Sequence, residues 1–141
     1  MKKSNKKTKE RKIVPFINRC DLLIVDDEES IRDFVGKIIH SRFPKLRIQS
    51  AENGLEGFKK VKSFNPRIVW TGVKMPQMDG LELIKLIRQD PDLANTKIVV
   101  CTGCYKMKDV ESRALELGVD RFLPKPFKVE EALSAMEDCL S

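Results

Sequence analysis

Residues 21–28 read DLLIVDDE, a short apolar run followed directly by three acidic side chains. The run over residues 21–25 is continuous and aliphatic, which is typical of a strand that a parallel sheet buries on both faces. The carboxylates of Asp26, Asp27 and Glu28 follow at the point where the chain leaves this strand. The junction predicts an α/β protein with polar groups at the carboxyl edge of its sheet.

Helical patterns alternate with further apolar runs along the rest of the chain. A helix is predicted over residues 30–43 with Ser30 as its N-cap, because apolar residues recur there at helical spacing. The other predicted strands cover residues 46–50, 68–71, 97–101 and 121–123, and the other predicted helices cover 54–64, 80–88, 108–117 and 128–140.

Local signals support several of these boundaries. Asp79 and Glu82 have the spacing of a capping box, and Gly118 lies where a glycine commonly ends a helix. Five strands that alternate with five helices predict a (βα)5 domain of three layers, with helices covering both faces of a parallel sheet. Ligands of such sheets bind beyond the carboxyl ends of the strands.

The composition describes one globular domain. The chain has 141 residues, of which 41% are hydrophobic and 34% charged, so a mostly disordered chain is excluded. No apolar run approaches the roughly 20 residues that span a bilayer, and we expect a cytoplasmic protein with no membrane contact. A single His and four Cys argue against a His-rich metal site and a disulfide scaffold.

The net charge of +6 is unevenly distributed. Residues 1–19 hold eight Lys and Arg against one Glu, a net charge of +7, and residues 20–141 carry a net charge of −1. We expect a disordered basic arm over 1–19 and a folded domain over 20–141. The arm is interpreted as a solubilising tail or as a polyanion-binding tail, and no other nucleic-acid contact is expected.

Polar residues also follow the later strands. Thr71-Gly72, Thr102-Gly103 and Lys125 come after the third, fourth and fifth predicted strands. With Asp26 and Asp27, they would form one rim that suits a divalent cation such as Mg²⁺ and a phosphoryl group. The alternative is structural: the two carboxylates cap the first helix and Lys125 pairs with them.

Four motifs in order give the chain a family resemblance. They are Asp26-Asp27-Glu28, Met75-Pro76-Gln77-Met78-Asp79-Gly80, Thr102-Gly103 and Lys125-Pro126-Phe127. Over roughly residues 20–141 this pattern resembles the receiver domain of two-component response regulators, of the single-domain chemotaxis type. The resemblance implies a flavodoxin-like fold with a parallel sheet of strand order 2-1-3-4-5.

The resemblance also implies roles for individual residues. Asp26 and Asp27 would hold Mg²⁺ with the backbone carbonyl of Lys74. Thr102 would be the switch hydroxyl, Lys125 the ammonium that senses phosphate, and Phe122 the aromatic switch. The implied partners are signalling proteins, either a histidine kinase or a downstream target, which would contact the face formed by residues 108–117, 121–123 and 128–140.

One position departs from the family pattern. The phosphoacceptor Asp of the family lies three residues before the Met-Pro pair, and here that position is Gly72. Thr71 cannot replace it, because successive strand residues point to opposite faces. We therefore expect no catalytic residue, no enzyme activity, weak Mg²⁺ binding, and phosphorylation-independent protein–protein interaction. The alternative is an ordinary phosphorylatable regulator in which Gly72 is an engineered or variant residue.

Cys101 and Cys104 form a C-x-x-C motif at the end of a predicted strand. Such a motif suggests a thiol oxidoreductase, but Cys101 alternates with Val99 and is expected to be buried in the strand. Cys20 and Cys139 are interpreted as small hydrophobic residues of the core.

Overall fold

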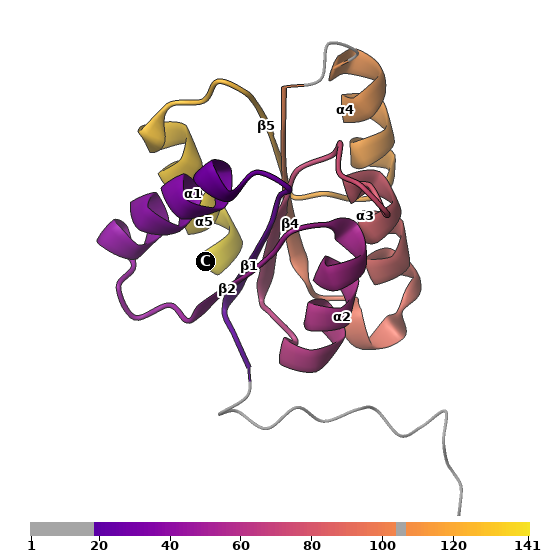
Figure 1. The fold of residues 1–141 in the computed structure, drawn as a ribbon, viewed down its shortest axis with the longest axis horizontal. Coiled ribbons are helices and arrows are strands. Elements are labelled where there is room, and N and C mark those ends of the chain that lie inside the picture. Colours follow the sequence, from indigo (N-terminus) through magenta and orange to yellow (C-terminus); the bar gives the residue numbers. More distant parts are fainter. Residues whose placement is uncertain (1–18, 104–106) are drawn as a thin grey trace, which may run out of the picture.

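A computed structural model of the protein describes residues 19–103 and 107–141, in which strand and helix alternate five times (Figure 1). The strands are β1 (Leu22–Val25), β2 (Ile48–Ala51), β3 (Ile68–Thr71), β4 (Lys97–Thr102) and β5 (Arg121–Pro124). The helices are α1 (Glu29–Arg42), α2 (Gly54–Phe64), α3 (Gly80–Gln89), α4 (Met107–Glu116) and α5 (Val129–Leu140). The predicted arm, apart from Arg19, and Cys104 lie outside the described residues.

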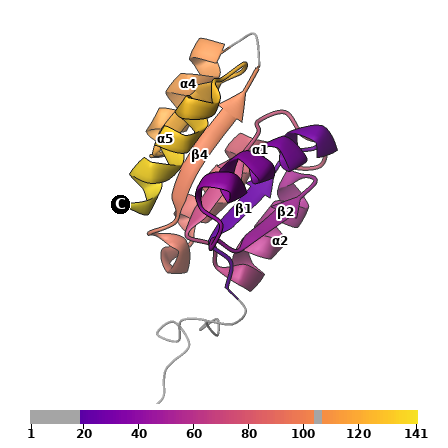
Figure 2. The same ribbon diagram turned by 90° about the vertical axis from the view of Figure 1, so that its left-hand side faces the viewer.

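The five strands form one parallel sheet in the order β2-β1-β3-β4-β5. Helices α1 and α5 cover one face, and α2, α3 and α4 cover the other (Figures 1 and 2). The structure therefore confirms the three-layer, flavodoxin-like fold and the strand order predicted from the sequence. No helix among the described residues is long and apolar enough to cross a membrane.

The apolar strands fill two cores, one on each face of the sheet. In β1, Leu23 and Val25 pack on the side of α2 and α3, and Leu22 and Ile24 pack on the side of α1 and α5. All four side chains are buried, which explains why the run is continuously apolar rather than alternating. The largest buried side chain, Trp70 of β3, belongs to the α1 and α5 side.

The predicted start of α1 was wrong. The helix begins at Glu29 with Glu28 as its N-cap, and Ser30 lies inside the first turn. The Glu28 carbonyl already accepts hydrogen bonds from the N–H groups of Ile31 and Arg32, and the Asp26 carboxylate accepts from the Glu28 N–H. The Asp26 carboxylate therefore holds the N–H of the N-cap residue, and the Glu28 side chain makes no capping hydrogen bond.

Most other boundaries agree to within two residues. Asp79 and Glu82 form the predicted capping box of α3, and Gly118 ends α4 with a φ of 72°. Strand β2 starts at Ile48 instead of residue 46, because the Arg47 carbonyl is occupied by the N–H groups of Asp21 and Leu22 before the regular ladder begins. The predicted loop after α3 contains a short 3₁₀ helix, Pro91–Leu93.

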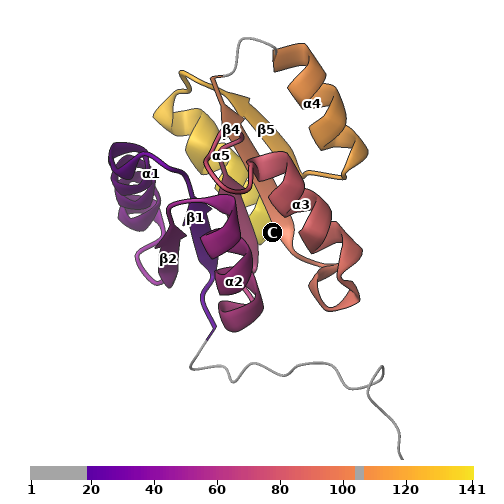
Figure 3. The ribbon, with the colours of Figure 1, turned by 45° about the vertical axis from the view of Figure 1, so that its right-hand side comes forward.

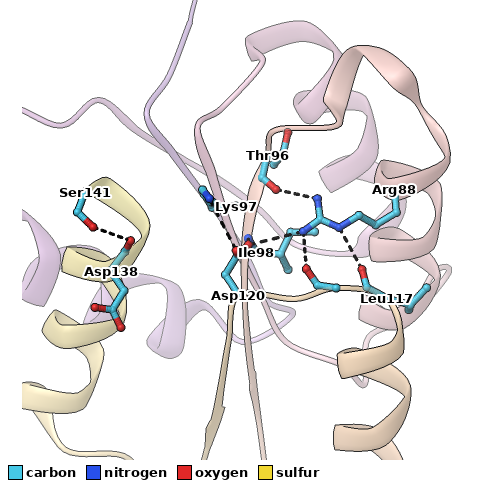
Figure 4. A network of polar contacts seen from close by, with 9 residues as sticks. Arg88, Thr96, Lys97, Ile98, Leu117, Asp120, Asp138 and Ser141 are labelled. Atoms are coloured by element: carbon cyan, nitrogen blue, oxygen red, sulfur yellow. Dashed lines mark hydrogen bonds and ion pairs between the residues drawn. The ribbon is translucent and has the colours of Figure 1, made fainter.

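Arg88 joins three segments at the end of the sheet where β4 begins (Figure 4). Its guanidinium donates hydrogen bonds of 2.8–3.0 Å to the carbonyls of Leu117, Thr96 and Gly118. It also lies 3.6 Å from the Asp120 carboxylate, which accepts a hydrogen bond from the N–H of Ile98 in β4. Arg88 thus satisfies carbonyls at the carboxyl end of α4 that the helix itself leaves without partners.

We expect Arg88→Ala to lower the free energy of unfolding by about 2 kcal/mol, because it removes a charged donor from three carbonyls. Urea denaturation measures this loss. The control is Lys85→Ala, an exposed residue of the same helix, which should change stability by less than about 0.5 kcal/mol. Equal losses in both variants would contradict the importance of the Arg88 contacts.

Candidate functional site

The register of the sheet brings the ends of β1 and β3 together. Val25 is opposite Thr71, and the Gly72 N–H donates to the Val25 carbonyl at 2.9 Å. The next residues in the two strands, Asp26 and Gly72, therefore lie side by side at the carboxyl edge of the sheet.

Strands β4 and β5 bring a second pair of residues to this edge. Thr102 is opposite Pro124, and the Lys125 N–H donates to the Thr102 carbonyl at 2.8 Å. The four strand ends surround a cavity of about 530 Å³. Its lining residues are Asp26, Asp27, Glu28, Gly72, Val73, Lys74, Cys101, Thr102, Gly103 and Lys125.

Asp26 is a buried polar residue of the cavity that several contacts hold in place. Only 4% of the residue is exposed, and its Oδ1 accepts the Glu28 N–H at 2.9 Å. Its Oδ2 lies 3.6 Å from the Nζ of Lys125, and its main-chain carbonyl accepts Nη1 of Arg32 at 2.8 Å. Burial raises the pKa of the Asp26 carboxyl above its usual 3.8, because desolvation disfavours the charged form, and the Glu28 N–H and Lys125 oppose this shift.

The Asp26 carboxylate extends into the space beside Gly72. A Cβ atom on Gly72 would lie 2.9 Å from Oδ2 of Asp26 and 3.8 Å from the Cys101 carbonyl. The φ of Gly72 lies outside the left-handed region, so the backbone itself would accept another residue. Space is therefore the limit here, and a side chain on residue 72 requires the Asp26 carboxylate to move.

Thr71 and Asp79, the nearby residues with oxygen side chains, do not supply a nucleophile at the position of Gly72. Thr71 is fully buried, and its hydroxyl donates to the Gly72 carbonyl at 2.8 Å. Asp79 accepts the Glu82 N–H as the N-cap of α3. Gly80 in turn packs against the Gly72 carbonyl, where a Cβ atom would come within 1.9 Å.

The structure brings most of the other predicted site residues together. Thr102, buried to 4% exposure, and Lys74, exposed, both line the cavity with Lys125. Phe122 is different: it is half-buried and packs against the core cluster on the α4 side, which contains Val110. It is absent from the cavity lining.

The donor set of the cavity fits a metal ion only in part. The described residues contain no group of three or more His, Cys, Asp or Glu placed to hold an ion. Asp26 and Asp27 supply carboxylate oxygens, which Mg²⁺ prefers, but Lys125 already lies beside Asp26.

Cys101 is a lining residue that the sequence did not assign to the cavity. Its burial was predicted from the alternation with Val99 and is confirmed, since it is 1% exposed. Burial raises the pKa of its thiol to about 12, an effect that Lys125 opposes and Asp26 supports. Such a thiol remains protonated at neutral pH and is a poor nucleophile.

The other two described cysteines also behave as predicted. Cys20 and Cys139 are free and buried in the two cores, and burial raises the pKa of each thiol to about 11.

The response regulator receiver domain family matches residues 22–137 of this chain. The chain belongs to this family. A chemotaxis protein CheY of Listeria monocytogenes is 35% identical over 117 residues, which cover 82% of this chain and 94% of the relative. A CheY of Halobacterium salinarum is 29% identical over 85% of this chain and 96% of its own length.

Solved structures share the fold of this receiver domain. The N-terminal domain of an uncharacterised protein from Wolinella succinogenes superposes with a TM-score of 0.76 at 31% identity, covering 86% of this receiver domain chain and 94% of the other. A CheY-like receiver domain protein from Methanospirillum hungatei has the same TM-score and coverage at 24% identity, which supports the fold alone.

Asp26 makes the stability of the receiver domain depend on pH. Because folding raises its pKa above 3.8, the folded protein holds this proton more tightly than the unfolded chain. Its contribution to the free energy of unfolding therefore falls as pH rises from about 3.8 through the raised value. Asp26→Asn cannot ionise, so its stability relative to the parent should increase over this range.

Urea denaturation at a series of pH values measures this difference. The control is Asp27→Asn, which removes the exposed neighbouring carboxylate and should retain the fall seen in the parent. If the curves of Asp26→Asn and the parent run parallel, the buried carboxyl is not the source of the pH dependence.

Proposed function

We propose that this receiver domain signals by protein–protein contact without being phosphorylated. The observation that carries the proposal is Gly72, which occupies the position where the family pattern has its phosphoacceptor Asp. A glycine offers no carboxylate for an acyl phosphate. We also propose that the domain is not an enzyme and that it works in the cytoplasm.

The surroundings of Gly72 support this proposal. The side chains of Thr71 and Asp79 are engaged in hydrogen bonds of their own, at the Gly72 carbonyl and at the start of α3. The Asp26 carboxylate lies where a residue 72 side chain would begin, and Lys125 is its ionic partner. Two groups that the family uses around a phosphoryl group, Asp26 and Lys125, thus pair with each other.

The surface proposed for partners is the face formed by α4, β5 and α5 (Figure 3). Strand β5 ends the sheet, and its residues alternate between the two cores: Phe122 packs on the α4 side and Leu123 on the α5 side. Leu115 of α4 is 58% exposed, so this helix presents an apolar side chain to solvent. The proposed partners are signalling proteins, either a histidine kinase or a downstream target.

We expect Mg²⁺ to bind weakly to Asp26, Asp27 and the backbone carbonyl of Lys74. Gly72→Asp should increase the affinity on the order of tenfold, because it adds a carboxylate to the cavity. Isothermal titration of both proteins with MgCl₂ measures the difference. Gly72→Asn is the control, since it adds a side chain of the same size without the charge, and an equal gain in that variant would contradict the role of charge.

The central test is incubation with acetyl phosphate and Mg²⁺ followed by intact mass spectrometry. We expect no adduct on the protein. A stoichiometric gain of about 80 Da, the mass of a phosphoryl group, that survives acid and is lost in base would overturn the proposal.

The same assay addresses the alternative, a regulator in which Gly72 replaces a working acceptor. In Gly72→Asp the Asp26 carboxylate must rotate to make room for the new side chain. If the rest of the site is competent, this variant should acquire the base-labile adduct in a Mg²⁺-dependent manner. The absence of any adduct in the folded variant would count against the alternative.

A further inference from the structure

A groove of about 610 Å³ lies between α3 and α4, which run side by side on one face of the sheet (Figure 3). Its apolar lining comes from both sides: Met78 precedes α3, Leu81 and Leu86 belong to α3, and Leu117 follows α4. Leu81 is buried and the other three side chains are half-buried. The floor of the groove is therefore apolar, and the chain itself covers it only in part.

Four charged side chains surround this floor. Helix α3 supplies Glu82 and Lys85, and α4 supplies Arg113 and Glu116. All four residues are exposed, and none of the ion pairs between described residues involves any of them. Glu82 uses one oxygen to accept the Asp79 N–H at 3.4 Å. Two acidic and two basic groups thus border the groove without neutralising one another in ion pairs.

The order of the charges is reversed between the two helices. On α3 the acid comes three residues before the base, and on α4 the base comes three residues before the acid. Both helices run in the same direction, because each connects two neighbouring parallel strands. A two-fold axis along the helices would lay α3 of one copy against α4 of another. Acid would then face base along both helix pairs, so the groove is complementary to itself.

We infer that the α3–α4 groove binds a second copy of this chain in a symmetric dimer. The apolar floor would lie at the centre of the contact and the four charges at its rim, as in other protein interfaces. The floor would supply affinity, and the paired charges would fix the orientation of the two copies.

This groove is separate from the surfaces discussed above. It shares no lining residue with the cavity beside Gly72, and Leu115 of α4 is not among the residues that line it. Dimer formation is therefore independent of the proposed signalling role, and the face formed by α4, β5 and α5 remains available to other partners.

The test is sedimentation velocity of the full-length chain at concentrations from about 10 to 500 µM. We expect the weight-average mass to rise from that of a monomer toward that of a dimer. The acidic variant, Lys85→Glu with Arg113→Glu, places like charges against each other. It should weaken dimer formation by at least about tenfold.

A complementary basic variant makes the test specific to this groove. It combines Glu82→Gln, which retains an oxygen acceptor for the capping box, with Glu116→Lys. This variant should also be monomeric when it is alone. An equimolar mixture of the acidic and basic variants should regain the dimer, because their rims have opposite charge. Recovery in the mixture would also show that both variants are folded.

The matched control is Lys37→Glu with Lys45→Glu, two exposed residues in α1 and in the loop after it. It changes the net charge by the same amount as the acidic variant and should dimerise like the parent. The inference is overturned if the parent stays monomeric at every concentration, or if the acidic variant dimerises as the parent does. It is also overturned if the control loses as much as the acidic variant, or if the mixture fails to regain the dimer.

Discussion

The in-register pairing of β1 with β3 is the constraint on which the cavity at the carboxyl edge depends. Because Val25 and Thr71 are opposite each other, the residues that follow them must leave the sheet together. The pairing of β4 with β5 does the same for Thr102 and Lys125. The chain order places β1 next to both β2 and β3, which is the topological switch point where parallel sheets open for ligands.

The charge balance of this cavity follows from the same geometry. A buried carboxylate without a partner costs several kcal/mol, so Asp26 depends on the Glu28 N–H and on Lys125. The Glu28 N–H comes from the same loop as Asp26, and Lys125 comes from the loop that follows β5. Gly72 leaves room for this arrangement, since any side chain there would compete for the space of the Asp26 carboxylate.

The sequence could predict the order of elements because strand runs and helical periodicity are local properties of the chain. It could also predict which residues follow each strand, and so most of the cavity lining. It placed the start of α1 one residue too late and at the wrong cap, because Ser30 is a preferred N-cap residue whereas the Glu28 that occupies this position makes no capping hydrogen bond with its side chain. The sequence could not predict the contacts of Arg88 either, because the groups that accept its hydrogen bonds are main-chain carbonyls as far as 30 residues along the chain.

The folded part of the chain is nearly neutral, yet the two edges of its sheet differ in charge. A strand of four residues spans about 13 Å, which exceeds the Debye length of about 8 Å at physiological ionic strength. Solvent-exposed charges at one edge of the sheet are therefore largely screened from those at the other. The electrostatic potential at each edge depends mainly on the residues found there. Carboxylates dominate where β1 ends, and bases dominate where Arg19, Arg67 and Lys97 meet. The net charge of +6 is thus a sum over regions of the chain that differ in sign.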